Sequence, residues 1–88
     1  MNYEILYDEQ PKRLLKKLDK HISERILKTV RRVLTDNAVP QNAKSIMGKH
    51  GVFRLRIGPH RILYRLDNEQ NSIVVFKIDK RSRVYERL

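Results

Sequence analysis

Alternating apolar and basic side chains occupy the middle of the chain. Between residues 51 and 66, two such runs are joined by Gly58-Pro59, and runs of this kind on either side of a turn predict a β-hairpin. Successive side chains of a strand point to opposite faces. Pairing would therefore gather large apolar residues on one face, namely Phe53, Leu55, Ile57, Ile62, Tyr64 and Leu66. The other face would carry four arginines: Arg54, Arg56, Arg61 and Arg65.

Apolar residues recur with helical spacing in the first part of the chain. Residues 2–7 alternate and predict a short strand at a sheet edge. Asp8, followed by Glu9 and a proline, is typical of a helix start, with the Asp8 side chain accepting hydrogen bonds from the first amides. Apolar positions then recur every three or four residues up to Leu34. Both one long helix and two helices broken near Asp19-Lys20 fit this pattern, and Asp19 is a cap for the second.

The remaining segments complete the expected architecture. Residues 35–41 are polar and end the helix, residues 42–48 are too short to classify, and residues 68–71 form a turn. Residues 72–78 are the most apolar run and predict a central strand covered at least partly on both faces. This order predicts an α+β fold, a small antiparallel sheet of about four strands with an N-terminal helical hairpin packed on one face. Residues 1–88 would form a single domain, and the arginine side of the sheet would stay uncovered.

Net charge changes the functional picture. The chain has 20 Lys+Arg against 10 Asp+Glu and a pI of about 10.3, which favours binding to nucleic acid or to an acidic protein. A solvated sheet face usually mixes charges of both signs. A face with arginine as its only charged residue therefore points to a polyanion, and phosphate suits the bidentate guanidinium. The alternative is a basic surface that is only solvated.

Several classes of site are disfavoured. The chain has no cysteine, and its three histidines are dispersed without ligand-like spacing, so we expect no metal site and no cofactor. No apolar run approaches the roughly 18 residues of a membrane span. The N-terminus lacks the basic-then-apolar order of a secretory signal. These features predict a cytoplasmic protein without membrane contact.

Four segments together resemble the RelE/ParE superfamily of prokaryotic toxins. They agree with it in order, spacing and length, and they are residues 42–48, 53–58, 61–64 and 80–85. The resemblance implies the toxin of a type II toxin-antitoxin pair, held silent by an acidic, RelB-like antitoxin in a higher-order complex. For the RelE branch it also implies a ribosome-dependent endoribonuclease that cleaves messenger RNA in the decoding site.

The same resemblance implies the site residues. In the RelE branch the functional groups correspond here to Arg54, Arg56, Arg61, Arg81 and Tyr85. Nucleic-acid contacts are expected from Arg54, Arg56, Arg61, Arg65, Lys77, Arg81 and Arg83. Positions 54 and 56 are lysines in the best-known ribosome-dependent members, and the turn at residues 58–60 is shorter here.

Chemistry gives these residue types different roles. Metal-free RNA cleavage by the 2′-hydroxyl needs a base, positive charge at the phosphorus and an acid for the 5′-oxygen. Arginine supplies the charge but keeps its protons. Tyr85 is then the candidate for proton transfer, or for stacking on a base; alternatively it anchors the C-terminus to the sheet. His60 on the turn is a weaker candidate base.

Two other functions remain open at this point. One is a ParE-like toxin that inhibits DNA gyrase without enzymatic activity, a branch that typically lacks the terminal tyrosine. The other is a basic RNA- or ribosome-binding module without catalysis, for which the charge alone would suffice.

Overall fold

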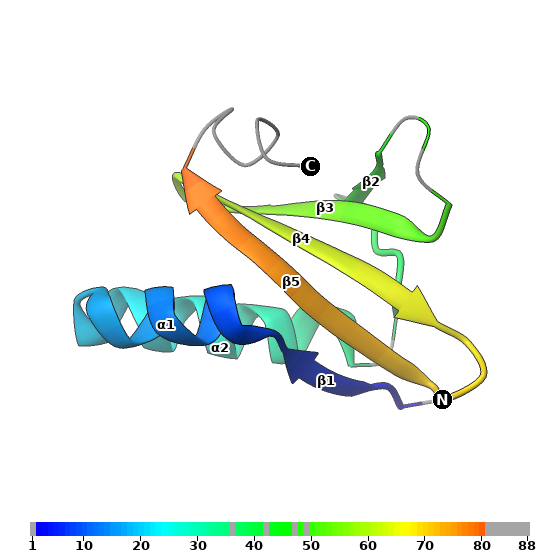
Figure 1. The fold of residues 1–88 in the computed structure, drawn as a ribbon, viewed down its shortest axis with the longest axis horizontal. Coiled ribbons are helices and arrows are strands. Elements are labelled where there is room, and N and C mark those ends of the chain that lie inside the picture. Colours follow the sequence, from blue (N-terminus) through cyan, green and yellow to red (C-terminus); the bar gives the residue numbers. More distant parts are fainter. Residues whose placement is uncertain (1, 36, 42, 47, 49, 81–88) are drawn as a thin grey trace.

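The computed structural model describes residues 2–35, 37–41, 43–46, 48 and 50–80. A short strand precedes two helices, and four further strands follow them (Figure 1). The elements are β1 (Glu4–Tyr7), α1 (Glu9–Lys17), α2 (Lys20–Leu34), β2 (Ala43–Ser45), β3 (Val52–Ile57), β4 (His60–Asp67) and β5 (Ser72–Lys80).

The strands form one sheet in the order β1-β5-β4-β3-β2. Strands β2 to β5 pair antiparallel with their neighbours. The predicted α+β fold is confirmed, with two differences in detail. β1 pairs parallel with β5, a direction that alternation alone does not encode. Ala43–Ser45 adds a fifth strand, too short to show a periodicity of its own.

Two helices form rather than one, and the break falls where the sequence placed it. α1 ends at Lys17 and α2 begins at Lys20. The Asp19 carboxylate accepts a hydrogen bond from the His21 backbone N–H at 2.9 Å, as an N-cap residue does. The first helix begins where the sequence predicts, with Asp8 at the N-cap position, but the predicted side-chain cap was wrong, because the Asp8 side chain makes no cap hydrogen bond. Its carboxylate lies 3.7 Å from the Arg65 guanidinium instead.

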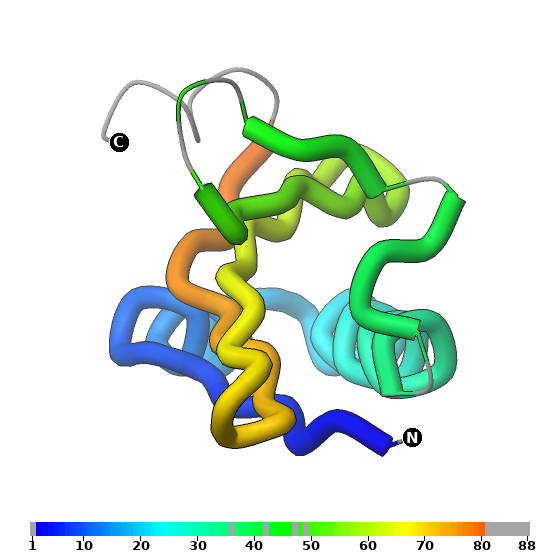
Figure 2. The backbone as a smooth tube through the Cα atoms, turned by 90° about the vertical axis from the view of Figure 1, so that its right-hand side faces the viewer, coloured from blue at the N-terminus to red at the C-terminus, as the bar shows by residue number. Residues whose placement is uncertain are grey.

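The core lies between α2 and the sheet. Figure 2 shows α1 and α2 as two coils in the lower half of the molecule, with β4 and β5 drawn between them. The side of the sheet that faces away from α2 is called here the outer face. From α2 the core takes Ile26, Val30 and Leu34, all at most 1% exposed. From the sheet it takes Leu55, Ile57, Ile62, Tyr64, Ile73, Val75 and Ile78. This is the apolar side of the hairpin, as the alternation predicts.

A β-bulge in β5 keeps the strand in phase with the core. Tyr64 pairs with Val75 and Leu63 with Lys77, which leaves Phe76 as an extra residue. Strict alternation from Val75 would turn Lys77 inward and Ile78 outward. The bulge reverses this: Ile78 is buried in the core, and Lys77 shares the face of Leu63.

The N-terminal segment closes the open edge of β5. After β1 ends, the Asp8 backbone N–H donates to the Val75 carbonyl at 2.9 Å. The Gln10 side chain then makes two hydrogen bonds with Ile78: it donates to the carbonyl at 2.9 Å and accepts from the N–H at 3.0 Å. The Gln10 amide therefore takes the place of a neighbouring strand at Ile78 and satisfies the backbone N–H and carbonyl of this residue.

Candidate functional site

Arginines gather on the outer face because of the β3–β4 register. Leu55 lies opposite Ile62 on the core side, and Arg56 lies directly opposite Arg61 on the outer side. Arg54 lies opposite Leu63. Directly paired residues in an antiparallel ladder have Cβ atoms about 4.5–5.5 Å apart. The Arg56–Arg61 pair is therefore a like-charge contact that the sheet holds in place.

An open concavity of about 590 Å³ lies over three strands of this face. We call it the basic concavity, and its walls are formed by Lys44, Arg54, Arg56, Gly58 and Arg61. Lys44 joins the three arginines because β2 pairs with β3 in a register that sets Lys44 opposite Arg54. Lys44 is not among the site residues that the sequence predicts. In the sequence, Lys44 is marked only by its positive charge, and the strand pairing of its segment could not be predicted.

The β3–β4 turn closes one end of the basic concavity. Gly58 has a φ of +59°, as the first position of a II′-type two-residue hairpin loop requires, and glycine takes this conformation without strain. A Cβ at this position would lie 3.6 Å from Nη1 of Arg25. The guanidinium of Arg25, from α2, therefore packs beneath the turn.

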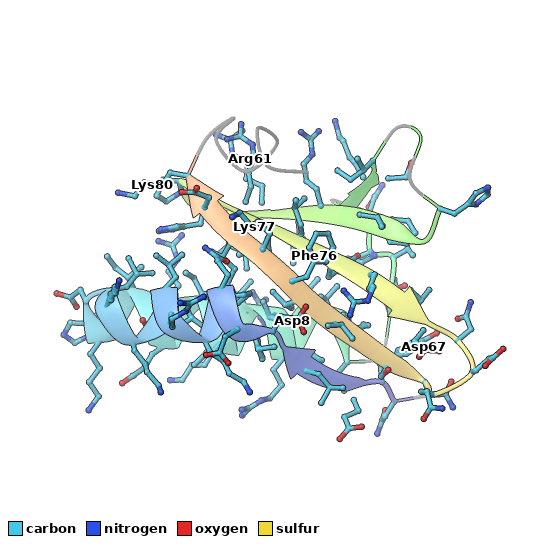
Figure 3. The ribbon with its side chains drawn as sticks, viewed as in Figure 1. Asp8, Arg61, Asp67, Phe76, Lys77 and Lys80 are labelled. Atoms are coloured by element: carbon cyan, nitrogen blue, oxygen red, sulfur yellow. The ribbon has the colours of Figure 1, made fainter. Side chains whose placement is uncertain are left out.

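Arg65 and Lys77 lie on the same face but do not line the basic concavity. The guanidinium carbon of Arg65 lies 5.8 Å from the centre of the Phe76 ring, and Arg65 also pairs with Asp8. In Figure 3, Arg61 lies near the end of the sheet, whereas Phe76 and Asp8 lie further along β5. These partners hold Arg65 away from the arginines at positions 54, 56 and 61.

The His60 side chain lies on the core side of the sheet, opposite to the basic concavity. It pairs with Ile57 on the core side and is 3% exposed. Burial lowers its pKa, the nearby Lys80 ammonium lowers it further, and Asp79 partly opposes them. The imidazole is therefore neutral at pH 7. It lines a separate hollow with Arg25 and Lys80, so the structure gives no support for His60 as a base in the basic concavity.

Three of the residues selected from the sequence, Arg81, Arg83 and Tyr85, lie outside the described residues. Within the part of the chain that the structure describes, no group of three or more His, Cys, Asp or Glu residues could hold a metal ion. In the same part, no helix has the length and apolar character needed to cross a membrane.

A second hollowed surface follows β1 on the helix side. Two hollows share Ile5, Tyr7 and Leu27, and basic residues from both helices stand at their margins. We call this surface the β1 groove; its basic residues are Lys12, Lys16 and Arg31. Burial raises the pKa of Tyr7 to about 12, against the opposing charge of Arg31. Its phenol therefore stays protonated near neutral pH and contributes an aromatic wall.

The basic concavity has the chemistry of a phosphodiester site. Guanidinium groups bind phosphate oxygens in a bidentate way and stay charged in any cellular environment. Cations fixed around one hollow also stabilise the extra negative charge that develops when phosphorus becomes five-coordinate. An ammonium group differs from them in one respect, because it can give up a proton.

The sequence is similar to those of known toxins. The profile of the ParE toxin family of type II toxin-antitoxin systems, parDE, matches residues 5–85. A curated relative, the toxin RelG of Mycobacterium tuberculosis, is 40% identical over 37 residues, which span 42% of this chain and 42% of that protein.

Solved structures match over nearly the whole chain. The toxin-antitoxin complex RelBE2 of Mycobacterium tuberculosis is 25% identical, with a TM-score of 0.79 over 93% of this chain and 94% of that one. The archaeal RelE-RelB complex of Pyrococcus horikoshii is also 25% identical, with a TM-score of 0.79 over 94% and 99%. The Escherichia coli RelBE complex, at 20% identity, has the same fold, with a TM-score of 0.77 over 92% and 99%.

Proposed function

The chain belongs to the ParE toxin family of type II toxin-antitoxin systems, within the RelE/ParE superfamily, and on that premise we propose that it is a ribosome-dependent endoribonuclease. Its substrate is messenger RNA in the decoding site, and cleavage blocks translation in the cytoplasm. The observation that carries this proposal is the basic concavity, where residues of three adjacent strands surround one hollow. A hollow lined by cations fits a bent phosphodiester as its ligand better than it fits the flat surface of a protein.

The arginines have distinct places in the proposed reaction. Arg56 and Arg61, as a directly opposed pair, neutralise the two non-bridging oxygens of the scissile phosphate. Arg54, one pleat further along β3, positions the neighbouring phosphate. From the family resemblance, Arg81 adds charge at the transition state, and Tyr85 transfers a proton or stacks on a base.

The ribosome is part of the proposed site. An open concavity of about 590 Å³ does not enclose an RNA strand, so the decoding centre must hold the substrate in a reactive conformation. Cleavage of free RNA should therefore be weak. Activity should also survive EDTA under conditions in which the ribosomes stay intact.

The test is single-turnover cleavage of end-labelled messenger RNA on programmed ribosomes. We expect cleavage at one position in the decoding site and a parallel loss of peptide synthesis. Comparable cleavage of free RNA, or peptide synthesis unaffected at toxin concentrations that saturate the ribosomes, would contradict the proposal.

We also propose an acidic, RelB-like antitoxin as the partner. The similar chains from Mycobacterium tuberculosis and Pyrococcus horikoshii were solved as toxin-antitoxin complexes, and a chain with a formal charge of +10 attracts an acidic segment. Acidic side chains would neutralise Arg54, Arg56 and Arg61, and apolar ones would enter the β1 groove. Several copies would assemble into a higher-order complex.

The second candidate is inhibition of DNA gyrase, which the matching family profile favours because it is that of ParE toxins. A supercoiling assay with purified gyrase separates the two functions. Loss of supercoiling with translation intact would favour gyrase. Binding to ribosomes without cleavage and without effect on gyrase would leave a plain RNA-binding module.

A further inference from the structure

We infer that Lys44 is the general acid of the proposed cleavage reaction and protonates the 5′-oxygen that leaves. This inference rests on the proposed nuclease function and adds a role that the arginines cannot take. It places a catalytic proton on β2, the short edge strand, rather than on the central hairpin.

Geometry brings Lys44 into the basic concavity. Lys44 pairs with Arg54 across the β2–β3 ladder, so its side chain leaves the sheet on the outer face, beside that of Arg54. It lines the same hollow as Arg56 and Arg61. Lys44 is level with Arg54 and Arg61 with Arg56. With strands about 4.8 Å apart and residues about 3.4 Å apart along a strand, the backbones of Lys44 and Arg61 are separated by roughly 12 Å along the diagonal. A lysine and an arginine reaching inward from these positions can meet one phosphate from opposite sides.

Chemistry distinguishes Lys44 from the other cations of the concavity. Arginine has a pKa above about 12 and keeps its protons in proteins. Lys44 is the one side chain lining the hollow, among the described residues, that can exchange a proton. Its ammonium is exposed at the edge of the sheet, so water can restore the proton after each turnover.

Cleavage begins with attack of the 2′-hydroxyl on the neighbouring phosphorus. The 2′-hydroxyl loses its proton to solvent water, and its oxygen forms a bond with phosphorus. The bond between phosphorus and the 5′-oxygen then breaks, and that oxygen takes a proton from the Lys44 ammonium. The products are a 2′,3′-cyclic phosphate and a 5′-hydroxyl, and the neutral Lys44 amine regains a proton from water.

The experiment uses two substrates that differ in one atom. Ribosomes are programmed with messenger RNA that has either the natural 5′-oxygen or a 5′-sulfur at the mapped cleavage position. A thiolate leaves without protonation, because the pKa of a thiol lies near about 8.5, far below that of an alcohol. The variants are Lys44→Ala and Lys44→Arg, with Lys28→Ala on the exposed side of α2 as a matched control. Thermal unfolding checks that each variant folds.

With the natural substrate, we expect Lys44→Ala to cleave about 10²-fold more slowly at saturating toxin. Lys44→Arg should bind ribosomes like the original protein yet remain slow. With the 5′-sulfur substrate, all variants should cleave at nearly the same rate. Lys28→Ala should behave like the original protein on both substrates.

Three results would overturn the inference. An equal defect of Lys44→Ala on both substrates, or full activity of Lys44→Arg, would reduce Lys44 to a positive charge while the nuclease function stands. If the unsubstituted protein cleaves neither substrate on the ribosome, the proposed function fails, and the assignment of Lys44 fails with it.

Discussion

Directly opposed arginines in the site lower the stability of the sheet. Arg56 and Arg61 face each other across the β3–β4 ladder, and like charges in this position destabilise a sheet by about 0.2–1 kcal/mol. A phosphate between them removes the repulsion. An oppositely charged or neutral pair at these two positions would stabilise the sheet more. The arginine pair therefore suits the binding of an anion better than it suits the stability of the fold.

Arg61→Gln should therefore separate activity from stability. We expect the cleavage rate on programmed ribosomes to fall by about 10² to 10³-fold, the range for losing one preorganised electrostatic donor. The free energy of unfolding should stay equal or rise slightly. Urea titrations and single-turnover kinetics measure the two effects, with Arg32→Gln on the exposed side of α2 as the control. A loss of stability that accounts for the loss of activity would refute the assignment.

His60 should make stability depend on pH in the acidic range. Its pKa is lowered in the fold by burial and by Lys80, with Asp79 partly opposing, and Arg25 of α2 lines the same hollow. The unfolded state therefore binds more protons below about pH 6.5, so stability is full above that pH and falls as the pH drops. The slope should not exceed about 1.4 kcal/mol per pH unit for one proton.

Replacing His60 with a group that does not titrate tests this dependence. We expect His60→Gln to flatten the curve of unfolding free energy against pH between pH 5 and 7, whatever its effect on stability at pH 7. The matched control is His21→Gln, because His21 is exposed at the start of α2. An unchanged slope in His60→Gln would show that other groups set the acid sensitivity.

Among the elements, Gln10 joins the start of α1 to the end of β5. Gln10→Ala would leave the Ile78 N–H and carbonyl without their partners, at a cost of about 1–3 kcal/mol in unfolding free energy. Gln10→Glu keeps the acceptor but places an oxygen against the Ile78 carbonyl, so it should recover only part. Chemical denaturation measures both variants against the exposed Gln70→Ala. Equal unfolding free energies of the two Gln10 variants and Gln70→Ala would show that solvent replaces these hydrogen bonds.

Local sequence patterns predict one part of the sheet and fail in another. Alternation on the hairpin gave the faces of Phe53, Arg54 and Leu55 correctly, because a register follows from a two-residue turn. In β5 alternation fails at Phe76, since a bulge is chosen by packing against the core and not by the strand's own sequence. Lys44 was missed for a related reason: a three-residue strand has no period, and its place in the site depends on a partner strand.

At the scale of the whole molecule, opposite charge should dominate recognition of the antitoxin. We expect the affinity for an acidic antitoxin to fall as salt rises, and Arg56→Glu to weaken binding by at least about tenfold, or about 1.4 kcal/mol. Lys28→Glu changes the net charge by the same amount on the exposed side of α2 and should weaken binding less. Calorimetry at several salt concentrations measures this. Equal effects of the two substitutions would mean that only net charge matters.

The position of β5 also sets when the fold can be completed during synthesis. β5 lies between β1 and β4, supplies Ile73, Val75 and Ile78 to the core, and is the last of the described strands to be made. A nascent chain that still holds β5 within the ribosome has both neighbouring strands but no strand to join them. Its helices and hairpin then remain an open intermediate without a shared core. The strands that form the basic concavity are therefore stably supported only after Lys80 has emerged. Until then the apolar surfaces of the helices and the hairpin stay exposed to other cellular proteins that bind such surfaces.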